Sequence, residues 1–189
     1  FLWEAAYIEH HGFAVRERLL IDERTMISDL SHRLLDLGWE WYRVQILGQE
    51  KRGSTGRGIS PTYSDETAQF QMYYYEFLLE ESAFRNRMEA RLDRALRTLR
   101  HVCQVPGEEL RRFFEVLSEA EAQANENLIE AGLFPAESFD FTRFTGVDPW
   151  QPKIGAIVDS YWKAGCQLRG QIGDVRERLR AILESGRYV

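Results

Sequence analysis

Long apolar runs are missing from this sequence of 189 residues. The longest uncharged apolar stretches, such as residues 154–158, fall far short of the roughly 20 residues that a bilayer-spanning helix needs. The sequence therefore predicts no membrane span. Residues 1–11 carry acids and histidines where a signal peptide needs a cationic start and an unbroken apolar run, so nothing here favours secretion.

Cysteine is scarce as well. Cys103 and Cys166 are the only two, and they form neither a metal-binding nor a redox-active spacing. This usage favours a reduced, cytoplasmic protein. The sequence also lacks the Glu-x-x-His pairs that helical sites for two metal ions require. We therefore predict no metal site and no cofactor.

The composition is that of a folded protein, with 44% apolar and 29% charged residues. The length suits one domain, so we expect a single helical domain over residues 1–189. The chain has no initiator methionine, which favours a piece excised from a longer protein. A net charge of -6 argues against a surface that binds nucleic acid over its whole extent, although a local basic face is compatible with it.

Helical periodicity is the main pattern in the sequence. Apolar residues recur at spacings of three and four, which keeps one side of a helix facing a core. These stripes predict four long helices, over residues 14–48, 64–102, 106–131 and 153–185.

These helices predict an all-α fold: an up-and-down bundle of about four long helices plus a short N-terminal helix, with coiled-coil-like packing. Ser64 is the expected N-cap of the second helix. Four glycines interrupt the last one and predict a kink, a break or close packing there. No segment reads as a strand.

Two connections differ in character. Residues 48–60 are rich in Gly, Ser and Arg and predict a flexible surface loop. This loop has the glycine spacing of a phosphate-binding P-loop, but Ser54 stands where the lysine is needed and no strand precedes it. Residues 132–152 carry five aromatic side chains, so we expect that connection to pack on the bundle.

A basic stripe is the sharpest chemical feature. Arg87, Arg91, Arg94 and His101 project to one side of the same predicted helix, at 100° per residue. The three arginines are candidate anion-binding residues, since a guanidinium matches phosphate oxygens and could give local contact with nucleic acid. The alternative is that they pair with acidic residues of neighbouring helices.

Arg94 and His101 are separated by six residues, and this spacing resembles the R-x4-6-H signature of HEPN-type ribonucleases, which are helical domains. The resemblance implies metal-independent cleavage of RNA. His101 would move the proton of a 2′-hydroxyl and Arg94 would stabilise phosphate charge. These two residues are the candidates for catalysis, and the sequence identifies no complete catalytic set.

Glu81 falls on the apolar stripe of its predicted helix, where an unpaired charge is costly. We expect a paired polar position that fixes helix register, with a partner among Tyr73, Tyr74 and Tyr75. The alternative is a carboxylate with a perturbed pKa in a site.

The function predicted from these features is a non-catalytic interaction or scaffold module within an oligomer or larger complex, so the protein is more an interaction module than an enzyme. Self-association or a protein partner follows from the long apolar stripes. Two alternatives stay open. One is the HEPN-like endoribonuclease, and the other is a helical module that binds anions or nucleic acid.

Overall fold

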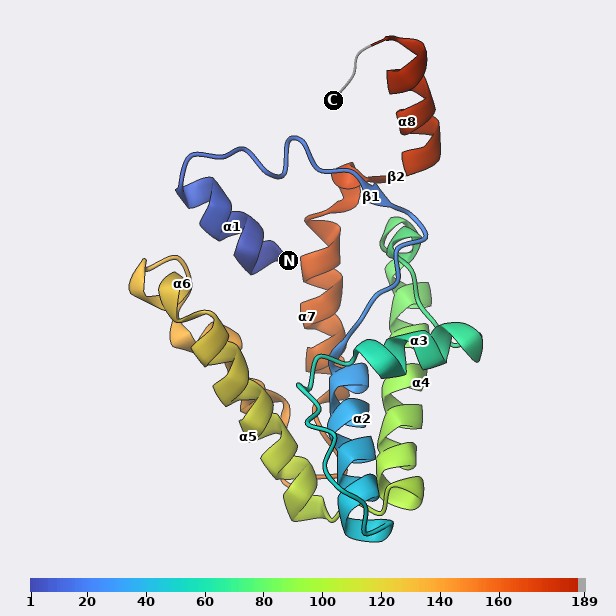
Figure 1. The fold of residues 1–189 in the computed structure, drawn as a ribbon, viewed down its shortest axis with the longest axis vertical. Helices are drawn as coiled ribbons and strands as arrows, with labels where there is room; N and C mark the ends of the chain where they lie inside the picture. The colour runs from blue at the N-terminus through green and yellow to red at the C-terminus, as the bar shows by residue number, and fades with distance from the viewer. Residues whose placement is uncertain (187–189) are drawn as a thin grey trace.

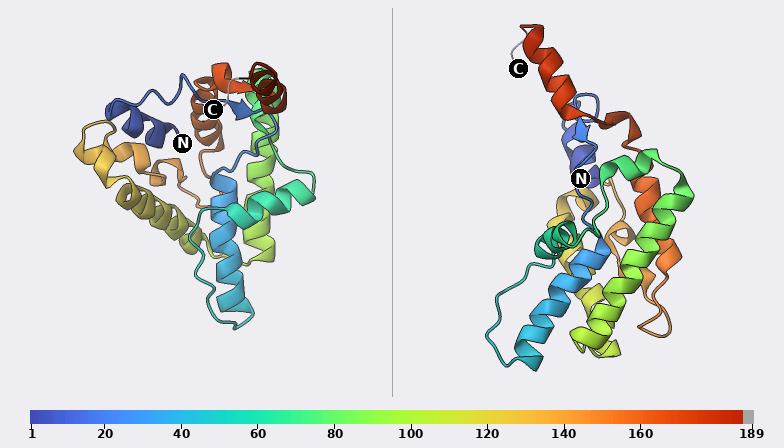
Figure 2. Two further views of the ribbon diagram at one scale, coloured as in Figure 1. Left: turned by 45° about the horizontal axis from the view of Figure 1, so that its top comes forward. Right: turned by 90° about the vertical axis from the view of Figure 1, so that its right-hand side faces the viewer.

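The computed structural model describes residues 1–186, which are mostly helical, in agreement with the predicted all-α class (Figures 1 and 2). The α-helices are α1 (Leu2–His10), α2 (Leu30–Trp41), α3 (Ile59–Thr67), α4 (Glu81–Arg97), α5 (Gly107–Ala124), α6 (Glu126–Glu130), α7 (Ile154–Cys166) and α8 (Val175–Glu184). The two short strands are β1 (Ile21–Asp22) and β2 (Ile172–Gly173). The π-helical turns are η1 (Tyr42–Ile46) and η3 (Thr98–Val102), and the 3-10 turns are η2 (Tyr74–Leu78), η4 (Ala136–Phe139), η5 (Thr142–Phe144) and η6 (Arg169–Gln171).

The first long helix, α2, is shorter than predicted. Asp29 is its N-cap: the Asp29 carboxylate accepts a hydrogen bond from the backbone N–H of Ser31, and the His32 ring accepts one from the backbone N–H of Asp29. This reciprocal capping starts the helix. Residues 14–28 before it form no helix, so the predicted helix over 14–48 is wrong in that part.

The second predicted helix, over 64–102, is divided into α3, η2 and α4. Ser64 lies inside α3 and is not an N-cap, because α3 begins five residues earlier. After α3, Gln69 adopts a φ of 62°, a left-handed conformation that ends the helix. The chain then forms a bridge between Tyr73 and Met26 before η2 and α4 follow. The prediction of one continuous helix over residues 64–102 is therefore wrong.

The third predicted helix, over 106–131, agrees with α5 and α6, which Asn125 separates. The fourth, over 153–185, is divided into α7 and α8. Between them β2 pairs in parallel with β1, so the prediction of no strand is wrong at this one place. At Gly165 a Cβ atom would lie 2.1 Å from the ring of Phe77. Both the break and the close packing expected from the glycines are found.

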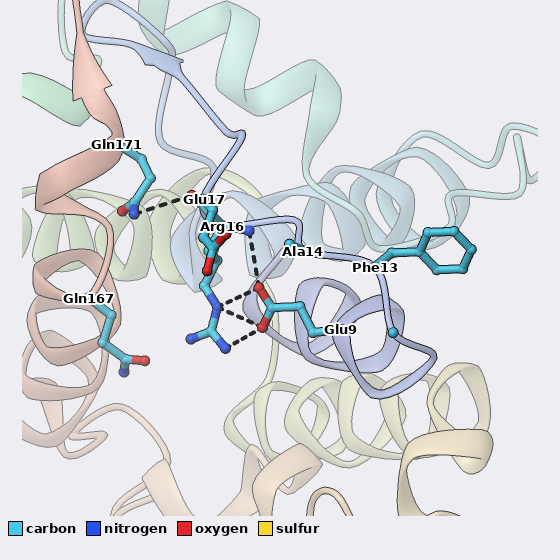
Figure 3. Close-up of a pocket in the computed structure, with 8 residues that line it drawn as sticks. Glu9, Phe13, Ala14, Arg16, Glu17, Gln167 and Gln171 are labelled. Atoms are coloured by element: carbon cyan, nitrogen blue, oxygen red, sulfur yellow. Dashed lines mark hydrogen bonds and ion pairs between the residues drawn. The ribbon is translucent and has the colours of Figure 1, made fainter.

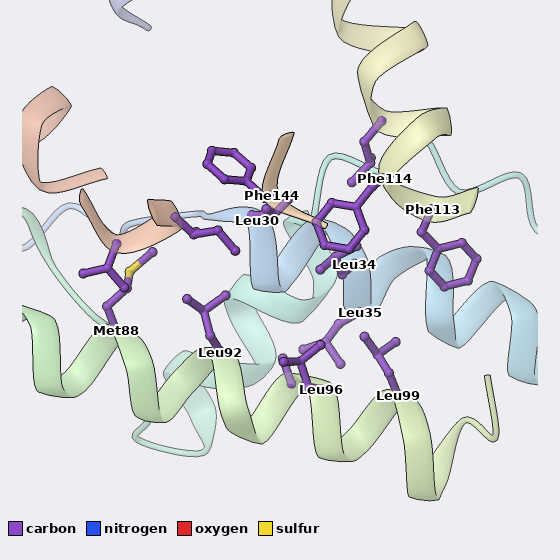
Figure 4. Packing of buried hydrophobic residues seen from close by; sticks show 14 of the residues in the cluster. Leu30, Leu34, Leu35, Met88, Leu92, Leu96, Leu99, Phe113, Phe114 and Phe144 are labelled. Atoms are coloured by element: carbon purple, nitrogen blue, oxygen red, sulfur yellow. The ribbon is translucent and has the colours of Figure 1, made fainter. Parts of the chain in front are cut away.

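Apolar side chains of α2, α4, α5 and α7 form one core (Figure 4). α2 packs against α4 and α5, and α4 packs against α7. Most of the stripe positions in α2, α4, α5 and α7 face this core, whereas Leu20, Val102 and Leu179 of the predicted helices are exposed. The up-and-down order and the coiled-coil-like packing stay predictions. Helical core residues with little exposure include Leu30 and Leu34 of α2, Phe84, Met88 and Leu92 of α4, Leu110, Phe114 and Leu117 of α5, and Ile157 and Val158 of α7.

The aromatic connection packs as expected. Phe139 and Phe144 are buried, and Phe141 and Trp150 are half-buried against the core. Trp3 of α1 lies edge-on to Phe139, with ring centroids 4.6 Å apart. The connection thus joins α1 to the rest of the molecule. Among the described helices none is long and apolar enough to cross a membrane.

Candidate functional site

A buried polar network lies where α2, α3 and α4 meet. Asp29 and His32 of α2, Asp65 of α3 and Arg91 of α4 are each almost wholly buried. The Asp65 carboxylate accepts from the Nη2 of Arg94 at 2.5 and 2.6 Å, and it faces the Nε2 of His32 at 3.2 Å. Arg91 donates to Asp29. These contacts fix α3 against the other two helices.

The hydrogen bonds of His32 define its tautomer. The backbone N–H of Asp29 donates to Nδ1 over 3.1 Å, so Nδ1 is an acceptor. A neutral ring then carries its hydrogen on Nε2, which donates to Asp65. His32 therefore links the cap of α2 to the middle of α3, and this is a positioning role.

Both aspartates of the network are held ionised. Burial by itself would raise the pKa of Asp29, but the Arg91 guanidinium and two hydrogen bonds from Ser31 outweigh it, and the pKa lies below its ordinary value. Burial would also raise the pKa of Asp65. The hydrogen bonds from His32 and Arg94 outweigh this effect, so the pKa of Asp65 lies below its ordinary value.

The network continues to a buried carboxylate that the sequence did not single out. Glu76 is 1% exposed, and its Oε1 lies 2.9 Å from the Nη1 of Arg87. Burial raises the pKa of Glu76, and the hydrogen bond from the backbone N–H of Tyr73 and the nearby arginines offset this only in part. Its Oε2 and the Nε of Arg91 have no hydrogen-bond partner among the described residues.

Glu81, by contrast, is exposed and pairs with Arg85 one turn further on. The predicted tyrosine partner and the buried register position are therefore wrong for Glu81. The buried carboxylate is Glu76, five residues before Glu81. The helical period predicted the wrong position because η2 and α4 are separate elements and do not share one apolar stripe.

The predicted arginine stripe is occupied by internal carboxylates. Arg87 pairs with Glu76, and Arg91 and Arg94 pair with Asp29 and Asp65 as described above. The geometry shows the pairing that the sequence left as the alternative. Anion binding by these three arginines stays a prediction.

The two catalytic candidates lie in different surroundings. The Arg94 guanidinium sits 4.3 Å above the ring of Phe70, on the α3 side. His101 belongs to η3 and lines a cleft beside Trp150. No contact joins Arg94 to His101 within the described part of the chain.

The loop before α3 rests on this network through two glycines. Gly58 has a φ of +75°, and a Cβ there would lie 2.8 Å from the backbone of His32. Its N–H donates to Asp36 over 3.2 Å. Gly56 is also left-handed and packs near Leu117. The prediction of a flexible linker over 48–60 is therefore wrong for this end of the loop.

Charged side chains of α2 and α5 contact the same loop. Arg33 donates to the carbonyl oxygen of Gly56 over 2.9 Å and pairs with Glu121 at 2.9 Å. Arg57 lies 3.4 Å from the same Glu121 carboxylate, yet half of its side chain is exposed. Glu121 thus faces two guanidinium groups, and Arg57 keeps donors free toward solvent.

The result is a fixed loop with an exposed polar edge. Thr55, Arg57 and Ser60 are exposed, whereas Gly56 and Gly58 between them are buried. No side chain caps the N-terminus of α3. Hydroxyls, a guanidinium and free backbone N–H groups at a helix start together suit an anionic group of a ligand. Paired glycines among hydroxyl residues were the sequence signal for this site.

A second feature is an open hollow of about 630 Å³ between the segment after α1 and the end of α7 (Figure 3). Figure 3 shows the Arg16 guanidinium facing the Glu9 carboxylate. The Nε of Arg16 donates hydrogen bonds of 2.9 and 3.0 Å to the two oxygens of that carboxylate. The side-chain and backbone hydrogen bonds from Arg16 lower the pKa of Glu9 to about 2. The two charges satisfy each other, so this hollow offers little to a charged ligand.

No cluster of histidine, cysteine or carboxylate side chains that could hold a metal ion occurs in residues 1–186. The rings of His10 and His11 lie edge to face with their centroids 5.5 Å apart, and no third ligand joins them among the described residues. The candidate chemistry therefore rests on the loop of residues 54–60 and its supporting network.

Comparison with known proteins gives one family. The model of the adenylosuccinate synthetase family matches residues 1–137. An adenylosuccinate synthetase of Myxococcus xanthus is 36% identical over 106 residues, covering 53% of this chain and 23% of that protein. One of Phocaeicola vulgatus is 30% identical over 98 residues, covering 52% and 22%. One of Synechococcus is 44% identical over 61 residues, covering 32% and 13%.

These matches correct the functional prediction. Proteins of this name are enzymes, so the non-catalytic scaffold and the preference for a non-enzyme are wrong. The two alternatives, an HEPN-like endoribonuclease and a module that binds anions or nucleic acid without catalysis, are overturned with it. Neither periodicity nor residue spacing carried the family signal. The chain aligns with less than a quarter of the length of the first two relatives.

Proposed function

The chain belongs to the adenylosuccinate synthetase family, and we propose that it forms the helical part of an enzyme that makes adenylosuccinate. The carrying observation is the match over residues 1–137, which includes the loop of residues 54–60 and the whole polar network beneath it. Because the alignments cover a small share of the relatives, the activity of the whole enzyme is part of this proposal.

The chemistry of the product suits the loop. Adenylosuccinate is a purine nucleotide whose amino nitrogen carries a four-carbon dicarboxylic acid, so it bears one phosphate and two carboxylates. An enzyme that makes it needs fixed donors for these groups. The exposed edge of the loop supplies hydroxyls, the Arg57 guanidinium and the uncapped start of α3.

Rigidity supports the same role. A ligand-binding loop binds more tightly when its conformation is set before the ligand arrives. Here Arg33, Asp36 and the two buried glycines hold the loop backbone, and His32 and Asp65 hold the helix that follows. We propose that the network's function is to position Arg57 and Thr55 for one anionic group of the nucleotide.

Titration of adenylosuccinate into the protein by isothermal titration calorimetry tests the proposal. We expect saturable binding that Arg57→Ala weakens by about tenfold or more, the loss of one charge-assisted hydrogen bond. The matched control is Arg52→Ala, which removes the same charge from the exposed first part of the loop. Equal affinities for the parent and the Arg57 variant, or no binding by the parent, would contradict the proposal.

The catalytic part has its own measurement. The bond to be made joins the amino nitrogen of aspartate to carbon 6 of the purine ring and replaces the bond from that carbon to its oxygen. A synthetase couples such a step to cleavage of a nucleoside triphosphate, and the displaced oxygen leaves in the inorganic phosphate released. Mass spectrometry detects adenylosuccinate formed from a 6-oxopurine nucleotide, aspartate and a nucleoside triphosphate.

A cytoplasmic location is part of this proposal. The two free cysteines support it, and cell fractionation tests it.

A further inference from the structure

A cleft on the far end of α4 is separate from the loop and its network. It measures about 380 Å³, within the size range of small-molecule sites. One wall is the end of α4 with the π-helical turn η3, and the other is the segment of residues 150–154. The second wall lies outside residues 1–137, so the cleft joins the family-matched part of the chain to a part beyond it.

The floor of this cleft is apolar. Leu96 and Pro152 are buried, and Trp150 and Ile154 are half-buried in the lining. Such a floor accepts the planar or apolar body of a small organic molecule. An aromatic ring against Trp150 gains both buried area and ring–ring contact.

The rim of the cleft is cationic. Arg97, Arg100 and His101 follow each other at spacings of three and one, so all three project from one side of α4 and η3. Asp93 is the one carboxylate in the lining, and it pairs with Arg97 at 2.7 Å. The rim therefore keeps an excess of positive charge.

Arg100 differs from the other arginines of this helix. Arg85, Arg87, Arg91, Arg94 and Arg97 each pair with a carboxylate of the chain. The Arg100 guanidinium makes no ion pair or hydrogen bond within residues 1–186, and it lies 5.5 Å from the ring centroid of Trp150. His101 beside it likewise has no hydrogen-bond partner in that range. Five donors of Arg100 and the ring nitrogens of His101 are thus unused.

We propose that this cleft binds a small organic anion with a planar body, seated on Trp150 and held at its anionic group by Arg100 and His101. A nucleoside monophosphate has this chemistry: the base meets the apolar floor and the phosphate meets the rim. The fork of Arg100 suits two phosphate oxygens, and the stem of Arg100 stays against the indole.

The π-helical turn places these groups. η3 spans Thr98–Val102, and a hydrogen bond of 2.9 Å from the N–H of Cys103 to the carbonyl of Thr98 closes it. Leu99 in the same turn is fully buried, which fixes Arg100 and His101 on the outer side. Such turns inside α-helices often mark functional positions.

The test follows the indole N–H signal of Trp150 by NMR in the full chain, assigned through Trp150→Phe. Three probes separate the parts of the ligand: AMP carries base and phosphate, adenosine lacks the phosphate, and ribose 5-phosphate lacks the base. We expect a saturable shift with AMP. Adenosine and ribose 5-phosphate should bind about tenfold or more weakly, since each lacks one contact.

Arg100→Ala should weaken AMP binding by about tenfold, and His101→Ala should weaken it in the same direction. Arg112→Ala is the matched control, because Arg112 is an exposed arginine on α5 outside the cleft. Arg57→Ala should leave the Trp150 titration unchanged, which separates this cleft from the loop. No saturable shift, an unaltered affinity in the Arg100 variant, or ribose 5-phosphate binding as tightly as AMP would overturn the proposal.

Discussion

At the scale of single residues, Asp65 carries more of the structure than its small side chain suggests. It faces both His32 and Arg94, and it is 3% exposed. We expect Asp65→Asn to lower the free energy of unfolding at neutral pH by about 2 kcal/mol, less than for a fully buried pair because Arg94 is a third exposed. Urea unfolding followed by circular dichroism measures this.

The control for Asp65 lies on the same helix as its partner. Asp93 pairs with Arg97 at 2.7 Å, but both side chains are more than half exposed. Asp93→Asn should change the free energy of unfolding by less than about 0.5 kcal/mol. An equal loss in both variants would show that burial of Asp65 is not the cause.

The pH dependence follows from the same carboxylates. Asp29 and Asp65 have lowered pKa values in the folded protein, so the unfolded chain binds more protons than the folded one in acid. Their stabilisation is complete above the ordinary aspartate pKa of about 4 and is lost as the pH falls through the lowered values. The deficit of Asp65→Asn should therefore shrink in acid, measured by urea unfolding across that range.

The contribution of Glu76 to stability depends on pH with the opposite sign. Its pKa is raised, so its contribution to stability is present below the ordinary glutamate pKa and is lost as the pH rises through the raised value. The helical pattern identifies Arg87, Arg91 and Arg94 as one stripe but does not identify the carboxylates that pair with them. Asp29 lies 62 residues before Arg91, and a helical pattern gives no information about such a distant pairing.

At the scale of elements, two of the left-handed glycines of the loop form a matched pair. Gly53 and Gly58 have φ values of +78° and +75°, but nothing lies within 4 Å of a Cβ at Gly53, and one at Gly58 meets the backbone of His32. Gly53→Ala should cost about 1 kcal/mol for the backbone conformation alone. Gly58→Ala should cost clearly more and displace α3. Thermal unfolding of both variants measures the difference, and equal costs would contradict it.

Helix α7 offers a second pair. Gly165→Ala places a methyl group 2.1 Å from the Phe77 ring, and we expect a loss of about 1–3 kcal/mol from overpacking. Gly155 lies in the same helix with nothing within 4 Å of a Cβ. Gly155→Ala should stabilise the protein by up to about 1 kcal/mol through helix propensity. Thermal melts compare the two, and a gain in both would argue against close packing at Gly165.

The elements also show where a pattern stops being informative. Apolar spacing identified the core faces of α2, α4, α5 and α7, because burial of those faces is what selects the residues. It ran across the breaks at Asp29 and Gln69, since apolar residues outside a helix, or in a separate helix, can keep the same phase by chance. The cap at Asp29 was visible in the sequence as an acid three residues before a histidine. The left-handed Gln69 was not, because a glutamine there gives no local signal.

At the scale of the whole molecule, α8 tests the prediction of self-association. None of its residues is buried, and Leu179 and Leu183 are 51% and 68% exposed. In a single copy the double change Leu179→Ser and Leu183→Ser should shift Tm by less than about 2 °C, because substitutions at exposed positions act weakly. Leu117→Ser, in the core, should lower Tm strongly.

Light scattering on the same proteins separates the two cases. Self-association through α8 would give a mass well above 22.1 kDa for the parent, which the double change returns to that of one chain. Tm would then fall with the double change and depend on protein concentration, since association stabilises the folded state by mass action. A mass of one chain before and after the change would contradict self-association and leave the apolar side of α8 facing water in the purified protein.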